Sequence, residues 1–125
     1  MKDWKNMEDA DFIGPLVQHY ELLSMIGSRL PIPVKLPDLE SGVELGTLID
    51  GVARLAKVSE DIPGVTEDVA ASIFTSSTCW LVAVDLFSAY EAEPAEFRVD
   101  GFAMSMINAR STLADAVRWI LHNGE

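Results

Sequence analysis

Residues 69–84 read VAASIFTSSTCWLVAV, and this uncharged run ends at Asp85. The whole chain has 20 acidic residues, 9 Lys or Arg residues and a net charge of −11, so such a long uncharged gap is unusual. Charged side chains are almost never fully buried unless they are paired, and their absence here indicates burial on nearly all sides. The run therefore predicts the central element of the core.

A helix over residues 66–90 is the structure that this run favours. Thr66 is a suitable N-cap, and Glu67 and Asp68 follow in the first turn, where the helix dipole favours acids. The β-branched residues in the run also permit a strand, but its length favours a helix. The run is shorter than the ~20 residues that span a membrane and has acids on both sides, so we expect no membrane span.

Proline, glycine and apolar spacing divide the rest of the chain. We predict a first helix beginning near Pro15, a second over residues 43–58 and a fourth over residues 99–122. Three prolines exclude a regular helix over residues 31–42, which form a connection that can pack along the bundle as a strap.

Local signals refine the ends and the packing of these helices. Ser41 is the expected N-cap of the second helix, in a capping box with Glu44. Gly46 and Gly51 indicate close backbone approach within that helix, and Gly124 is expected just beyond the last helix.

These signals predict an all-α fold. We expect one helical domain over residues 1–125, an antiparallel bundle of four main helices with the Pro-rich connection between the first and second. No internal repeat or linker divides the chain.

The sequence has no motif for catalysis, for metal binding or for a cofactor. Cys79 is the single cysteine, the two histidines have no metal-ligand spacing, and no nucleophile or phosphate-loop signature is present. The acidic charge opposes binding to nucleic acid and to anionic membranes, and it permits a basic protein partner. Because the N-terminal residues lack an apolar leader segment, we expect a cytoplasmic protein.

We predict a ligand site that consists of Asp85, Arg110, Trp80 and His19. Asp85 and Arg110 are each the odd charge on an apolar helix surface. Three arrangements stay open for them: a structural ion pair or an Arg110–Trp80 stack, an internal ligand site, and two charges that point to solvent.

A helix that is apolar on almost every side also suggests a second chain. We expect a homodimer with Phe74, Cys79, Val82 and Leu86 in its interface. The strap over residues 31–42 is the alternative cover for this surface.

Two functions follow as hypotheses. The first is a small acidic interaction or regulatory protein without enzymatic activity, of the adaptor, antitoxin or immunity type. The second is a helical bundle that binds a small molecule, with or without catalysis, in an internal cavity near Asp85 and Arg110.

Overall fold

The computed structural model describes residues 3–123 and confirms the all-α bundle. Its elements are η1 (Trp4–Asn6), α1 (Asp9–Ser28), α2 (Leu45–Val58), η2 (Ser59–Asp61), α3 (Glu67–Ala92), α4 (Glu96–Thr112) and α5 (Ala114–Asn123). No strand is present in this part of the chain, so the strand alternative for the uncharged run is excluded.

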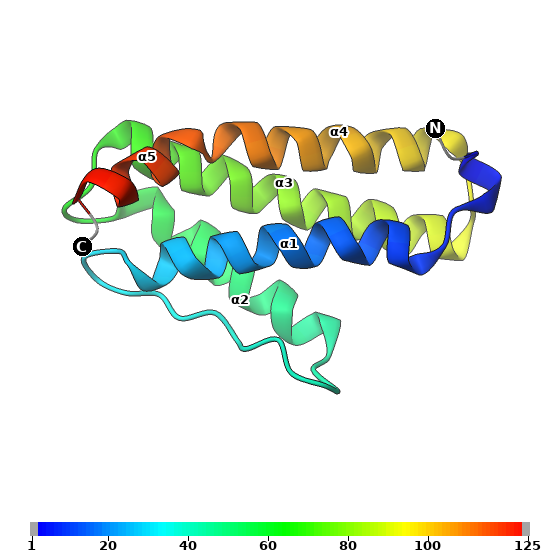
Figure 1. The fold of residues 1–125 in the computed structure, drawn as a ribbon, viewed down its shortest axis with the longest axis horizontal. Coiled ribbons are helices and arrows are strands. Elements are labelled where there is room, and N and C mark those ends of the chain that lie inside the picture. Colours follow the sequence, from blue (N-terminus) through cyan, green and yellow to red (C-terminus); the bar gives the residue numbers. More distant parts are fainter. Residues whose placement is uncertain (1–2, 124–125) are drawn as a thin grey trace.

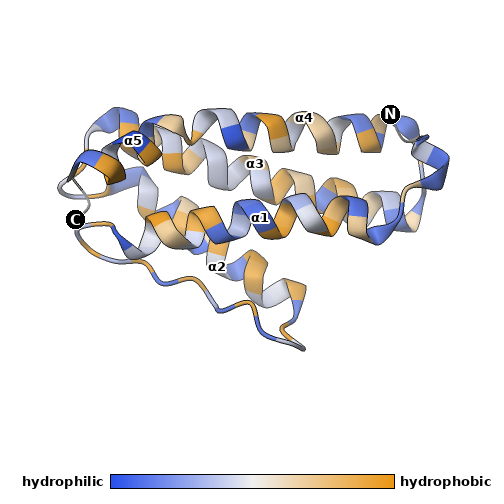
Figure 2. Ribbon diagram, in the orientation of Figure 1, coloured by the Kyte–Doolittle hydropathy of each residue, from blue (hydrophilic) through white to orange (hydrophobic). Residues whose placement is uncertain are grey.

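Helix α3 is the centre of the bundle, with α4, α1 and α2 arranged around it (Figure 1). The strap between α1 and α2 crosses back along the molecule, so these two helices run in the same direction (Figure 1). Helix α3 runs opposite to both, and α4 runs opposite to α3. Hydrophilic residues gather around η1 and the start of α1 (Figure 2).

The expected N-cap of α3 is confirmed, because Thr66 Oγ1 accepts the Val69 N–H at 3.2 Å. Ile73, Trp80 and Val84 are buried in the core. Within a single chain α3 is not buried on nearly all sides, and its burial by a second chain stays a prediction. Its neighbours cover only part of its circumference, and its outer face leaves Phe74 39% and Val82 45% exposed.

The strap packs along the bundle because two glycines leave room for it, Gly27 for the backbone at Val34 and Gly51 for the Pro37 ring. Val34 N–H donates to Gly27 O at 2.8 Å, and a Cβ on Gly27 would lie 2.5 Å from Val34 O. A Cβ on Gly51 would lie 2.5 Å from Pro37 Cδ, so close approach at Gly51 is confirmed. The same expectation for Gly46 was wrong, since nothing would lie within 4 Å of its Cβ.

Two predicted helix starts were also wrong. Helix α1 begins at Asp9 rather than near Pro15, because the Asp11 carboxylate accepts the Glu8 N–H at 2.8 Å and holds an earlier first turn. Helix α2 has Glu44, not Ser41, at its N-cap position, because Gly42 turns the chain with φ +87° after Ser41.

The predicted fourth helix is two helices that break at Leu113. The Ser72 hydroxyl, from α3, donates to Thr112 O and accepts the Ala116 N–H at 3.3 Å. It therefore occupies the place of the direct Thr112–Ala116 hydrogen bond of a regular helix. Gly124, expected to follow the last helix, lies outside the described residues.

Candidate functional site

The four residues predicted for a ligand site do not meet around one cavity. His19 and Trp80 are buried, whereas Asp85 and Arg110 are exposed. Within residues 3–123, neither exposed side chain makes an ion pair or a hydrogen bond, and Arg110 does not stack on Trp80. Of the three open arrangements, the structure shows two charges that point to solvent.

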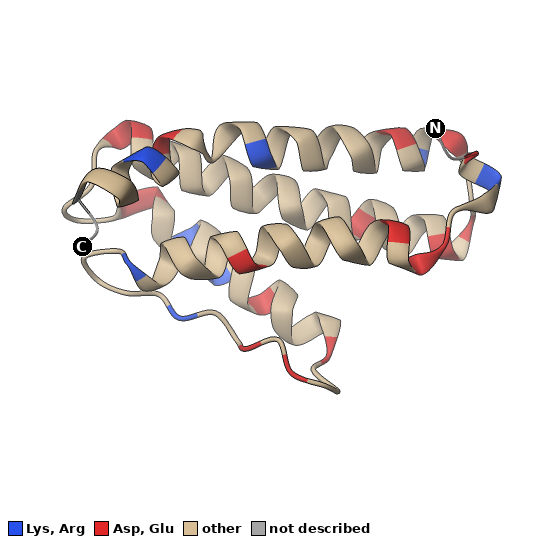
Figure 3. Cartoon of the chain, in the orientation of Figure 1, with Lys and Arg blue, Asp and Glu red and all other residues tan. Residues whose placement is uncertain are grey.

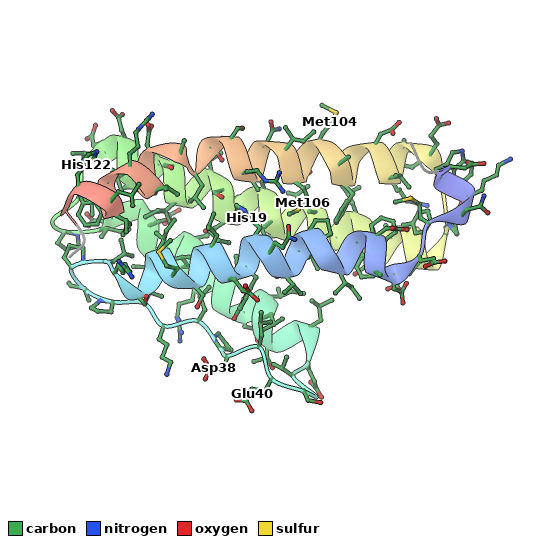
Figure 4. The ribbon with its side chains drawn as sticks, in the orientation of Figure 1. His19, Asp38, Glu40, Met104, Met106 and His122 are labelled. Carbon is green, nitrogen blue, oxygen red and sulfur yellow. The ribbon has the colours of Figure 1, made fainter. Side chains whose placement is uncertain are left out.

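His19 belongs to a buried polar network between three helices. It lies between α1 and α4 (Figure 4), and its Nε2 is 2.7 Å from Ser76 Oγ. Ser76 in turn donates to Ala109 O at 2.6 Å, so Nε2–H is the donor to Ser76. Burial, with a smaller contribution from nearby Arg110, lowers the pKa of His19 to about 4. A neutral histidine that is already hydrogen-bonded is typical of a structural role.

Trp80 forms one wall of an apolar cleft, the first candidate site that the geometry provides. The cleft has a volume of about 180 Å³ and lies among α1, the strap, α2 and α3. Its lining residues are all hydrophobic or aromatic: Ile13, Leu16, Val17, Tyr20, Leu39, Val43, Leu45, Leu48, Trp80 and Phe87. Neither Asp85 nor Arg110 lines it.

The polar atoms of the cleft lining already have partners. Tyr20 OH donates to Pro37 O, and Trp80 Nε1 donates to Leu16 O at 2.9 Å. Burial, with a smaller contribution from Asp38, raises the pKa of Tyr20, so this phenol stays neutral near pH 7. The lining therefore offers no free acid, base or nucleophile, and its chemistry is that of apolar contact.

The rim of the cleft combines exposed apolar side chains with acids. Ile13, Leu39 and Leu45 remain 45%, 37% and 39% exposed, which is high for large apolar residues. The segments that carry the rim, residues 6–28 and 36–53, contain acids but no Lys or Arg. Beside the rim, Asp38 and Glu40 point away from the bundle (Figure 4). Acidic residues also lie along the part of the strap that leads into α2 (Figure 3).

The residues predicted for a dimer interface divide between two environments. Phe74 and Val82 face outward, as described above. Cys79 is half-buried and its pKa is raised by burial. Leu86 is half-buried because it packs on Gly101 of α4, where a Cβ would lie 3.1 Å from its Cδ1.

Two further observations bear on the site. Among residues 3–123, no group of three or more His, Cys, Asp or Glu side chains is placed to hold a metal ion. Helix α3 is long and apolar enough to span a membrane by length and composition alone, a property that core helices of soluble proteins share.

No family model, curated protein or solved structure matches this chain.

Proposed function

We propose that this protein is a small acidic interaction protein without enzymatic activity, which captures a basic amphipathic segment of a partner protein. One apolar side chain of that segment enters the cleft, and its Lys and Arg residues face the acidic rim. The observation that carries the proposal is the cleft lining, which has apolar surface and no free polar group.

The volume of the cleft supports a ligand of side-chain size. A cavity of roughly 150 Å³ holds benzene, so about 180 Å³ accommodates an aromatic or branched aliphatic side chain. Helix-in-groove recognition uses such anchors.

The charge around the cleft supports a basic partner. Asp38, Glu40, Glu44 and Asp50 follow one another along the strap and α2, and Glu21 lies on α1. An acidic rim accelerates the encounter with a basic segment and disfavours acidic ones. A cytoplasmic location and the absence of catalysis are parts of the same proposal.

The test uses two synthetic peptides, one with Leu and Lys on opposite helix faces and one with Glu in place of Lys. Binding is followed by tryptophan fluorescence, because Trp80 lines the cleft. We expect the Lys peptide to bind, to bind more weakly as salt rises, and the Glu peptide not to bind.

Matched variants locate the binding. Leu39→Gln with Leu45→Gln changes one rim residue in the strap and one in α2, and we expect it to weaken binding about tenfold. The control Ile32→Gln with Val58→Gln also replaces one exposed apolar residue of the strap and one of α2 by glutamine. Both positions lie outside the cleft lining, so this variant should bind normally. Equal binding by both double variants would overturn the proposal. So would binding of a neutral apolar molecule such as benzene without binding of the Lys peptide, which would favour the small-molecule hypothesis.

A further inference from the structure

A second hollow, the acidic pocket, adjoins the apolar cleft and differs from it in chemistry. It has a volume of about 180 Å³ and lies between α1 and the strap, with a lining of Tyr20, Glu21, Ser24, Pro37, Asp38 and Leu39. This lining includes two carboxylates and an aliphatic hydroxyl, whereas the lining of the cleft is entirely hydrophobic or aromatic. The two hollows therefore suit different parts of a ligand.

The acidic pocket and the cleft share a wall. Tyr20 and Leu39 line both hollows, and at this wall the Tyr20 hydroxyl donates to Pro37 O and so joins α1 to the strap. Leu39 is 37% exposed, so the shared wall reaches the surface of the molecule. A ligand that lies across Leu39 can therefore place one group in each hollow.

The two hollows also follow one another along one face of α1. Ile13 and Val17 line the cleft, and Glu21 and Ser24 line the acidic pocket. These four residues are separated by steps of four, four and three, which keeps them on one side of the helix. From Val17 to Glu21 the distance along the axis is about 6 Å. A partner helix packed along α1 has the same distance between side chains four positions apart.

The polar groups of the acidic pocket are free for a ligand. Glu21, Ser24 and Asp38 make no side-chain hydrogen bond or ion pair within the part of the chain that the structure describes. A lysine ammonium has three donors and no acceptor, so two carboxylates and a hydroxyl match it. The lysine stem can pack on Leu39 and Pro37 while its charged end reaches the acids.

A metal ion fits the acidic pocket less well than an ammonium group. Among residues 3–123, no third His, Cys, Asp or Glu side chain joins Glu21 and Asp38 in a metal-binding group. Calcium takes six to eight oxygen ligands, and magnesium requires a near-ideal octahedral arrangement. An ammonium group needs no such fixed coordination.

We propose, as an extension that depends on the function proposed above, that the partner segment is a helix with a lysine on the same face as its apolar anchor. The lysine lies three or four positions from the anchor. The anchor enters the cleft, while the lysine enters the acidic pocket and pairs with Glu21 and Asp38. Other acids near the rim, such as Glu40 and Asp50, attract the segment without fixing the position of any one base.

The experiment measures binding of two helical peptides of identical composition to the full chain. In the same-face peptide, a lysine lies four positions on each side of the leucine anchor, which serves either direction of the helix. In the opposite-face peptide, the same lysines lie on the other side of the helix. Neither peptide contains tryptophan, so the fluorescence of the protein reports binding. We expect the same-face peptide to bind about tenfold more tightly.

Matched charge variants locate the lysine. Glu21→Gln with Asp38→Asn removes one helix charge and one strap charge from the acidic pocket, and both peptides should then bind equally. Glu40→Gln with Asp50→Asn also removes one strap charge and one helix charge, but outside that pocket, and the preference should remain. All four side chains are exposed, so the fold should be unchanged, and circular dichroism checks this.

Equal binding of the two peptides by the wild type would overturn the proposal, and so would the same loss of preference in both double variants. In either case a peptide still binds, so capture of a basic segment would stand without a defined lysine position. If neither peptide binds, the basic-segment function and the lysine position both fail.

Discussion

At the scale of single residues, Ser72 and Ser76 of α3 both donate a hydrogen bond to α4, but we expect them to contribute differently to the free energy of unfolding. Ser76 joins His19 Nε2 to Ala109 O. Removing the hydroxyl leaves the His19 N–H without its partner, whereas Ala109 O keeps a longer contact of 3.4 Å from Thr112 Oγ1. Ser72 separates Thr112 O from Ala116 N–H, and these two groups can bond to each other without it. The consequences of the two deletions should therefore differ.

We predict that Ser76→Ala lowers the free energy of unfolding by about 1–3 kcal/mol, because the buried N–H of His19 is left without a partner. Ser72→Ala should cost less than about 1 kcal/mol, since a regular helical hydrogen bond replaces the lost contacts. Urea denaturation measures both values. A larger loss for Ser72→Ala than for Ser76→Ala would contradict this assignment.

His19 should make stability depend on pH. Its pKa is lowered from 6.5 to about 4 on folding, so between these values the unfolded state binds more protons. Stability is therefore complete above about pH 6.5 and falls as the pH decreases toward 4, by up to about 3 kcal/mol.

The measurement is urea denaturation between pH 7 and 5, where most carboxylates stay ionised. His19→Gln keeps a side-chain N–H donor but does not titrate, so its stability should be nearly flat over this range. Equal slopes for His19→Gln and the wild type would rule out His19 as the source of the pH dependence.

At the scale of elements, the strap depends on the absence of two Cβ atoms. Gly27→Ala would press on the backbone at Val34 and Gly51→Ala on the Pro37 ring, and neither neighbour is a flexible side-chain end. We expect each to lower the free energy of unfolding by about 1–3 kcal/mol.

Gly46→Ala is the matched control for these variants. It lies in α2 with open space around it, so alanine should stabilise the protein by up to about 1 kcal/mol. Thermal unfolding ranks the three variants, and a stabilising Gly51→Ala would show that the strap is not held as described.

The elements also show what sequence could predict. Thr66 and the prolines after residue 30 act on neighbouring positions, so the start of α3 and the strap followed from local patterns. The break at Leu113 could not be predicted from local patterns. Ser72, the residue that bonds across it, lies forty positions away from Thr112 in the sequence. The sequence there continues an apolar helical spacing.

The cleft was not predicted, because it too is formed by residues that lie far apart in the sequence. Its walls come from four segments, and only Trp80 was among the predicted ligand residues. The useful signal was Leu39, an apolar residue among the acids of the predicted strap, followed by Val43 and Leu45 at the start of the predicted second helix. Asp85 was predicted to be a ligand residue because it ends the uncharged run, yet its side chain is exposed to solvent on α3.

At the scale of the whole molecule, α3 is long and apolar enough to span a membrane, yet hydrogen bonds connect it to the other helices of the bundle. Ser72, Ser76 and Trp80 bond to α4, α5 and α1, and inserting α3 into lipid would break these contacts. The net charge of −11 also opposes an anionic surface.

We therefore predict that the protein does not associate with membranes. In flotation with phosphatidylcholine vesicles, and with vesicles that also contain phosphatidylserine, it should stay in the aqueous fraction. Comigration with either kind of vesicle would contradict this prediction.

The helix break at Leu113 offers a built-in reporter of how the molecule opens. The amide of Ala116 is protected by a hydroxyl of α3 rather than by a carbonyl of its own helix. Its hydrogen exchange is therefore governed by separation of α5 from α3, whereas the amide of Val117, bonded to Leu113 O, exchanges when α5 itself unwinds. Comparing these two adjacent amides by NMR would distinguish undocking of the C-terminal helix from its melting.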